Sequence, residues 1–180
     1  MNFEEKLNHG FELLQDKDID HALDIARELQ KENDKSPEAF YLEALIMQQL
    51  NQYDLSMQNI TKALALDAEN AAYYNLRGSI YMQKEELENA EADFNKAVEL
   101  TDSSSAHRNI VMLMLMTDRG PQAIPYLIGR IKKDPRDAEN WILMGDMIKR
   151  GGQADKARTY YEQALNIDPE NDYARRQLEE

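Results

Sequence analysis

The chain has no cysteine and no apolar run long enough to cross a membrane, and each absence excludes a class of protein. Without cysteine, its 180 residues can form neither a disulfide nor a thiolate-bound metal site. The longest apolar run covers residues 110–116, whereas a transmembrane helix needs about 20 apolar residues. The first residues, MNFEEKLNHGFELL, are acidic where a secretory signal peptide is basic and then apolar. We therefore expect a cytoplasmic protein that does not bind membranes.

Basic residues are scarce as well. The sequence has 21 Lys and Arg against 34 Asp and Glu, which gives a formal net charge of −13. Residues 1–100 carry most of this excess, with nine basic and 21 acidic side chains. Nucleic acid requires a basic surface, so we expect no nucleic-acid partner. A solvated acidic surface that aids solubility is the favoured interpretation, and attraction of basic partners is the alternative.

Residues that could support catalysis are few. The composition, 42% hydrophobic and 31% charged, is typical of a folded globular chain. There is no glycine-rich phosphate loop, and the three histidines are isolated from one another in the sequence. At His9 and His107 the surrounding pattern favours a packed, hydrogen-bonded ring over a metal ligand or catalytic base. The sequence thus predicts neither an enzyme nor a protein with a metal or other cofactor.

The last third of the chain contains two helix-length segments. They lie in residues 138–171, where Gly151-Gly152 separates them and Pro169 closes the second. Apolar and small residues recur at helical spacing along one face of the first segment: Trp141, Met144, Gly145 and Ile148. The second segment carries a similar face: Ala157, Tyr161, Ala164 and Leu165. This pattern predicts a helix–turn–helix unit.

The unit resembles a tetratricopeptide repeat, a helix–turn–helix of 34 residues. The positions characteristic of the family fall on Trp141, Met144-Gly145, Ile148, Ala157, Tyr161, Ala164 and Pro169. The same period places repeats at 3–36, 37–70, 71–103, 104–137 and 138–171, with residues 172–180 as a short C-terminal cap. The resemblance implies an all-α fold, a right-handed α-solenoid of antiparallel helix hairpins, in a single domain over 1–180.

The fourth repeat, 104–137, fits the family pattern least well. Val111 stands where glycine is preferred, and Arg130 stands where alanine is preferred. Pro125 removes a backbone donor, so we expect the second helix of this repeat to start late or bend. The third and fourth repeats together are one residue short of two full periods, which leaves the register of the fourth uncertain by one residue.

The resemblance also implies a binding groove, because the first helices of such repeats line the concave face of the solenoid. In the apolar run 110–116, it assigns four residues to the core and three to the groove. The core residues are Ile110, Val111, Leu113 and Met114. With the register shifted by one residue, Leu113 and Met116 face the groove instead. The groove residues predicted over the whole chain are Leu7, Phe11, Leu14, Tyr41, Leu45, Asn75, Ser79, Met82, Met112, Leu115, Met116 and Ile142, with the polar residues Gln15, Gln48, Gln49, Gln83, Arg108, Asp146, Lys149 and Arg150.

A groove rich in Met and Leu adapts to apolar side chains of varied shape. The sequence therefore predicts a non-enzymatic scaffold, adaptor or chaperone that binds a protein or peptide segment with large apolar side chains. Two alternatives stay open. One is a self-associating subunit, for example a homodimer, whose groove packs against another copy. The other is a regulatory repeat module of a larger protein.

Overall fold

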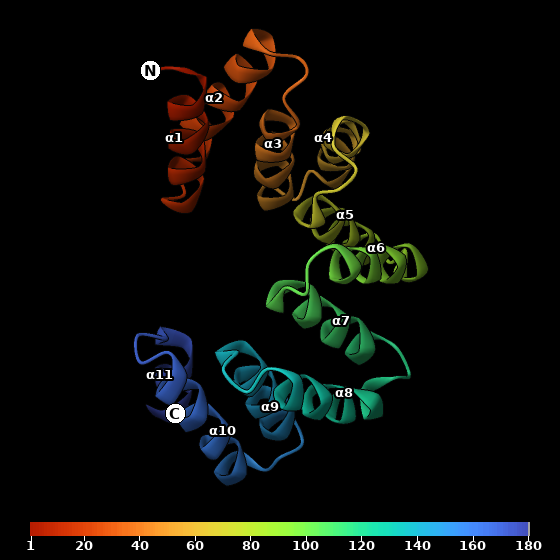
Figure 1. Ribbon diagram of the computed structural model, residues 1–180, viewed down its shortest axis with the longest axis vertical. Coiled ribbons are helices and arrows are strands. Elements are labelled where there is room, and N and C mark those ends of the chain that lie inside the picture. The colour runs from red at the N-terminus through yellow and green to blue at the C-terminus, as the bar shows by residue number, and fades with distance from the viewer. Residues whose placement is uncertain (180) are drawn as a thin grey trace. The chain divides into compact units, whose positions relative to one another are not determined.

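The computed structural model describes residues 1–179, which form α-helices and no strands (Figure 1). The helices are α1 (Phe3–Gln15), α2 (Ile19–Glu32), α3 (Pro37–Gln49), α4 (Tyr53–Leu66), α5 (Ala71–Gln83), α6 (Leu87–Leu100), α7 (Ser104–Met116), α8 (Gly120–Lys133), α9 (Ala138–Arg150), α10 (Ala154–Ile167) and α11 (Asp172–Glu179). Helices α1 to α10 form one hairpin in each of the five expected repeats, and α11 lies in the expected cap. The all-α prediction is confirmed.

The chain divides into two units, Met1–Asp102 and Ser103–Glu180. We call the first helix of each repeat the A helix (α1, α3, α5, α7, α9) and the second the B helix (α2, α4, α6, α8, α10). In the first unit α1 contacts α3 and α3 contacts α5, so these A helices form one layer. In the second unit α7 contacts α9, and α10 packs against both α9 and α11. The expectation of one domain over all five repeats stays a prediction.

Four of the five hairpins turn through a residue in the left-handed backbone region. These residues occupy the fifteenth position of their repeats: Lys17, Asn51, Glu85 and Gly152, with φ angles of 63°, 57°, 62° and 76°. The fourth hairpin turns differently. Its A helix ends at Met116 and is followed by the C-cap Thr117, whose φ is −119° and whose hydroxyl donates to the carbonyl of Leu113 at 3.0 Å. The fourth repeat therefore departs from the others in its backbone as well as in its sequence.

The structure resolves the register of this repeat. The linker between α6 and α7 has three residues, 101–103, whereas the other links between repeats have four. The missing residue thus lies before α7, and the two helices of repeat 104–137 keep the same lengths and spacing as those of the other repeats. The unshifted register holds.

Of the two effects expected from Pro125, a late start or a bend of the second helix of this repeat, the late start is wrong and the bend stays a prediction. Helix α8 begins at Gly120 and continues through Pro125, its sixth residue. Proline at this point removes the N–H that would reach the carbonyl of Pro121, the second residue of the helix. Both prolines are exposed, so water can reach this turn of the backbone.

The two helices of a hairpin approach closely where the A helix carries a small residue. A methyl group in place of the α-hydrogen of Gly78 would lie 2.7 Å from Cε1 of Phe94, and at Gly145 it would lie 2.6 Å from Cε1 of Tyr161. Real side chains do not approach this closely, so each aromatic ring fills the space that its glycine leaves. Small and aromatic residues therefore pair across the third and fifth hairpins.

We predict that Gly78→Ala and Gly145→Ala each destabilise the protein by about 1–3 kcal/mol, because the added methyl group overpacks a buried ring. Gly129→Ala in α8 is the matched control. Nothing lies within 4 Å of its added methyl group, and alanine favours a helix over glycine by up to about 1 kcal/mol. Chemical denaturation followed by circular dichroism measures all three. Equal losses at Gly129 and Gly145 would contradict this packing.

Candidate functional site

The start of every A helix is fixed by a capping side chain. In each case the residue before the helix accepts a hydrogen bond from a backbone N–H of the first turn, which otherwise has no helical partner. The caps are Asn2, Ser36, Asn70, Ser103 and Asp137. Each A helix therefore begins at the corresponding position of its repeat.

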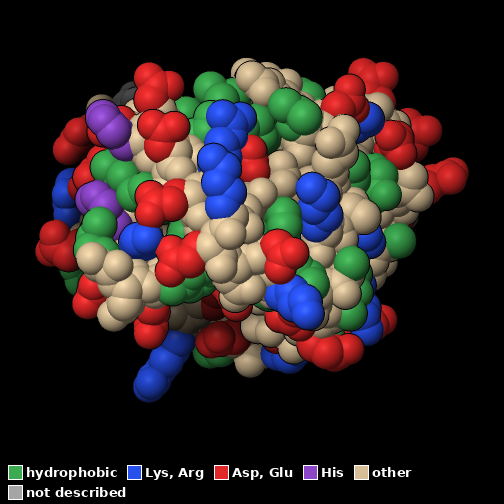
Figure 2. Space-filling view, turned by 90° about the horizontal axis from the view of Figure 1, so that it is seen from above, with side chains coloured by type: hydrophobic (Ala, Val, Ile, Leu, Met, Phe, Trp, Pro, Cys, Tyr) green, Lys and Arg blue, Asp and Glu red, His purple; other side chains and the backbone are tan. Residues whose placement is uncertain are grey.

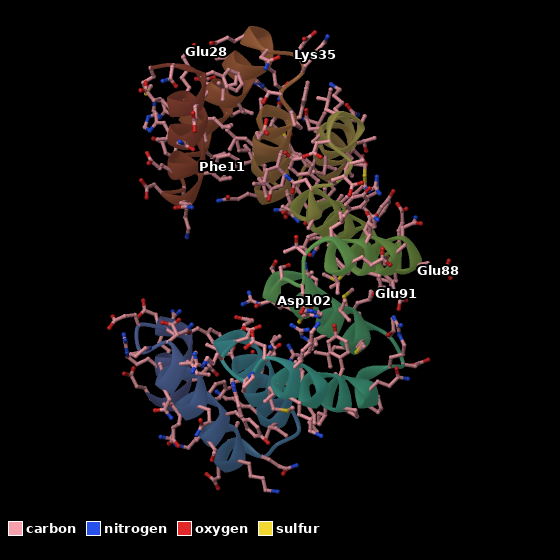
Figure 3. The ribbon with its side chains drawn as sticks, viewed as in Figure 1. Phe11, Glu28, Lys35, Glu88, Glu91 and Asp102 are labelled. Carbon is pink, nitrogen blue, oxygen red and sulfur yellow. The ribbon has the colours of Figure 1, made fainter. Side chains whose placement is uncertain are left out.

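In the first unit, aromatic rings line the A-helix layer. Phe11 lies on the side of α1 that faces α3 (Figure 3), and its ring centroid is 6.2 Å from that of Tyr41. The Tyr41 ring is in turn 4.9 Å from that of Tyr73 on α5. Burial raises the pKa of both phenols, that of Tyr73 further. Both hydroxyls therefore stay neutral, and the rings pack into an apolar layer between α1, α3 and α5, in which Tyr73 is buried.

The first unit also has a cleft of ≈390 Å³ at the C-terminal ends of its A helices. Its lining residues are Leu14, Leu45, Gln48, Gln49, Asn51, Tyr53 and Gln83. The Gln48 side chain donates to the Ser79 hydroxyl at 2.8 Å and so joins α3 to α5. Five predicted groove residues, Leu14, Leu45, Gln48, Gln49 and Gln83, line this cleft. The others in this unit lie elsewhere: Leu7, Phe11, Tyr41, Asn75 and Ser79 are half-buried, Gln15 is exposed, and Met82 is buried.

The second unit has a cleft of ≈340 Å³ that we call the α7–α11 cleft. It is lined by Arg108 and Met112 of α7, by Glu139, Ile142, Leu143 and Asp146 of α9, and by Asn171 and Tyr173 at the start of α11. Four predicted groove residues, Arg108, Met112, Ile142 and Asp146, therefore lie together. Met112, Ile142 and Leu143 supply its apolar part, and the last two are buried.

The polar groups of the α7–α11 cleft hold one another in place. Arg108 Nε donates to the Glu139 carboxylate at 2.6 Å. One oxygen of Asp146 accepts from the hydroxyls of Tyr161, at 2.8 Å, and Tyr173, at 3.0 Å. A carboxylate can accept further hydrogen bonds. The cleft thus combines an apolar pocket with carboxylates held in defined orientations.

The apolar run 110–116 divides among three environments. Ile110, Val111 and Leu113 are buried, while Met114 and Leu115 are partly buried against the core formed by α7, α8 and α9. Met112 lines the α7–α11 cleft, and Met116 is 49% exposed. Of the three residues predicted to face the groove, only Met112 lines a cleft.

The predicted basic residues at the end of α9 lie outside the α7–α11 cleft. Lys149 donates to the Gln177 side chain of α11 at 2.9 Å, and Arg150 is exposed.

Four cleft residues were not predicted from the sequence: Glu139, Leu143, Asn171 and Tyr173. Asn171 caps α11 by accepting from the Ala174 backbone at 3.1 Å, and this places Tyr173 in the first turn. Tyr173 is 42% exposed, although its hydroxyl reaches Asp146 on α9. The capping asparagine after Pro169 was the one local signal for this arrangement.

Among residues 1–179, no three or more His, Cys, Asp and Glu side chains are arranged to hold a metal ion. His107 is buried and shares a hydrogen bond with the Tyr126 hydroxyl, as expected for a packed ring, and His9 is half-buried beside Glu12. No helix in this part of the chain combines the length and hydropathy that a membrane span requires.

Comparison with known proteins identifies the repeats. A family model described as tetratricopeptide repeat matches residues 37–70, 71–103 and 138–171, the boundaries expected from the sequence. Over 119 residues the chain is 31% identical to the protein O-mannosyl-transferase Tmtc3 of Drosophila melanogaster, covering 65% of this chain and 13% of that protein. Over 125 residues it is 27% identical to the mitochondrial import receptor subunit TOM70 of Homo sapiens, covering 65% and 21%.

Solved structures show the same fold. The TPR protein TTC0263 of Thermus thermophilus superposes with a TM-score of 0.81 at 19% identity, covering 98% of this chain and 97% of that one. The chain spans between 13% and 34% of the length of the curated relatives it matches. Since the family model covers more than half of the sequence, the chain belongs to the tetratricopeptide repeat family, an α-solenoid of helix hairpins that serves as a scaffold for protein interactions.

Proposed function

We propose that the chain is a non-enzymatic adaptor or chaperone whose A helices hold a segment of a partner protein through its large apolar side chains. The α7–α11 cleft is the observation that carries this proposal, because it brings Met112, Ile142 and Leu143 together beside oriented carboxylates. Family membership supports protein binding in general. The cleft supports the particular chemistry of the ligand.

The lining of the cleft indicates what fits. A methionine side chain is flexible and polarisable, so Met112 can adapt to Leu, Ile, Met or Phe of a ligand. Displacing water from this apolar lining favours binding by about 25 cal/mol for each Å² buried. Asp146 and Glu139 provide acceptors for N–H groups or a Lys side chain beside the apolar residue. The proposed ligand therefore carries a large apolar residue next to a hydrogen-bond donor or cation.

The proposal assumes a cytoplasmic protein with neither a nucleic-acid nor a membrane ligand. The formal charge of −13 supports the exclusion of nucleic acid, since phosphates would be repelled.

A second candidate function is that of a regulatory repeat module within a larger protein. This function is favoured by the lengths of the curated relatives. They are about three to more than seven times as long as the region they share with this chain. In this case the same cleft would bind another part of that protein or its partner.

A displayed library of random peptides tests the proposal without a known partner. We expect the selected peptides to be enriched in large apolar residues. Met112→Gln should weaken their binding about 5- to 30-fold, because apolar contact is lost and an amide must be desolvated. Met116→Gln, the matched control outside the cleft, should leave binding nearly unchanged. Binding is measured by fluorescence anisotropy with labelled peptides.

Two results would contradict the proposal: selected peptides without apolar enrichment, or affinities that Met112→Gln does not change. Peptides that bind equally well to Met112→Gln and the unsubstituted chain would place the ligand on another surface.

The stability of neighbouring variants provides a separate prediction. Leu113→Gln should destabilise the protein by several kcal/mol, because a fully buried position would receive an amide without partners. Met112→Gln should keep most of the stability, since the side chain borders a cleft and glutamine favours helices almost as well as methionine. Thermal unfolding compares them. Equal losses would mean that Met112 is a core residue.

A further inference from the structure

In the first unit every A helix ends on a glutamine. Helix α1 ends at Gln15, α3 at Gln49 and α5 at Gln83, and each of these residues holds the thirteenth position of its repeat. All three side chains are exposed, and none has a hydrogen-bond partner within the described part of the chain. The fourth and fifth repeats carry Met116 and Arg150 at this position. We call the three residues the glutamine ladder, and it belongs to the first unit.

The ladder borders the cleft of the first unit. Gln49 and Gln83 line this cleft together with two leucines, and none of the lining residues is charged. Other polar side chains of the lining are already bonded: the Tyr53 hydroxyl donates to Asn51 Oδ1 at 2.8 Å, and Gln48 donates to α5. A glutamine amide has two N–H donors and a carbonyl acceptor. The ladder therefore offers a row of free donors beside an apolar surface.

The spacing of the ladder fits one extended conformation. Helix α1 contacts α3 and α3 contacts α5, and the axes of packed helices lie about 8–10 Å apart. In polyproline II, three residues complete one turn and rise about 9 Å, so every third residue turns the same side to the ladder. In a β-strand, residues three apart point to opposite faces. An α-helix bonds most of its carbonyls internally. Polyproline II is therefore the conformation that matches all three glutamines.

The charge around the ladder favours a basic ligand. Residues 1–102 hold nine basic and 22 acidic side chains, a net of −13, and acidic groups are spread over the face shown in Figure 2, with Lys and Arg between them. No basic residue lies in the last turn of α1, α3 or α5 to offset the negative end of the helix dipole. The turns 16–18 and 84–86, which follow α1 and α5, hold four acids and two lysines. One of these, Lys84, is already paired with Asp54 at 2.6 Å.

We propose that the glutamine ladder binds a basic segment of a partner protein in the polyproline II conformation. A backbone carbonyl of every third residue accepts a hydrogen bond from one glutamine, and Lys or Arg side chains between these residues face the acidic turns. Recognition of the backbone makes the site tolerant of the segment's exact sequence. The inference goes beyond the proposed function, because this site lies in the first unit and uses no residue of the α7–α11 cleft.

A labelled peptide of Pro-Pro-Lys repeated four times tests this site by fluorescence anisotropy. Proline fixes the polyproline II conformation, and lysine recurs at every third residue. We expect binding that weakens as salt rises. The comparison peptide is Gly-Gly-Lys repeated four times, which has the same charges and spacing but a flexible backbone. It should bind about fivefold more weakly or worse, because it must be ordered on binding.

Substitution of the ladder identifies the residues that bind. Gln15→Ala, Gln49→Ala and Gln83→Ala should each weaken the affinity for the Pro-Pro-Lys peptide about 2- to 10-fold, since each removes one hydrogen bond. The triple variant should weaken it about tenfold or more. Gln58→Ala, at an exposed position of α4, is the matched control and should leave the affinity unchanged. Alanine favours a helix at least as well as glutamine, and circular dichroism checks that the variants remain folded.

Three results would each overturn this inference: no binding of the Pro-Pro-Lys peptide, equally tight binding of the Gly-Gly-Lys peptide, or a triple variant that binds as tightly as the unsubstituted chain. Met112→Gln should leave the affinity for the Pro-Pro-Lys peptide unchanged. The triple variant should in turn keep its affinity for the apolar peptides selected from the library. Failure of this inference is thereby distinguished from failure of the proposed function.

Discussion

The close approach of the two helices in each hairpin is the constraint on which the rest of the structure depends. At the eighth position of a repeat the A helix is small, and at the twenty-fourth the B helix fills the remaining space. In four repeats the two sizes vary in opposite directions: glycine faces Phe94 or Tyr161, whereas Ala44 and Ile60 share one core and Val111 and Leu127 share another. In the first repeat both positions are small, Gly10 and Ala26, and Leu42 of α3 lies against the glycine instead. Stacking of neighbouring repeats buries the rest.

This spacing determines which A-helix residues remain available for binding. Side chains that point towards the B helix are buried within the hairpin. Side chains beside the next A helix pack between the repeats. The remaining side chains form a narrow strip along each A helix. In α7 this strip includes Met112 but not Leu113. Helix α7 is therefore apolar on two faces. One faces the core that α7 forms with α8 and α9, and the other faces the α7–α11 cleft.

The sequence predicted the repeats well because their signals are local and recur. Three signals mark the helix and repeat boundaries independently: helix caps such as Ser36 and Asn70, the small residues, and the 34-residue period. The helices lie where these signals place them. The register of the fourth repeat could not be settled, because one deleted residue in a short linker leaves the helical pattern on both sides unchanged.

The candidate site was less predictable, because it depends on contacts between distant residues. Tyr173 reaches Asp146 across 27 positions, and Arg108 reaches Glu139 across 31. No periodic pattern encodes such pairs. Met116 is exposed and Leu115 is partly buried, although the family register predicts that both face the groove. The two residues differ because the turn after α7 has its own geometry.

The claim that the α7–α11 cleft binds apolar side chains is tested most directly by nuclear magnetic resonance of methionine methyl groups. The nine methionines give separate probes, among them Met112 at the cleft and Met144 in the core. On titration with a peptide selected from a random library, the account predicts the largest shift at Met112 and a small one at Met144. A bound peptide that leaves the Met112 signal unmoved would contradict it.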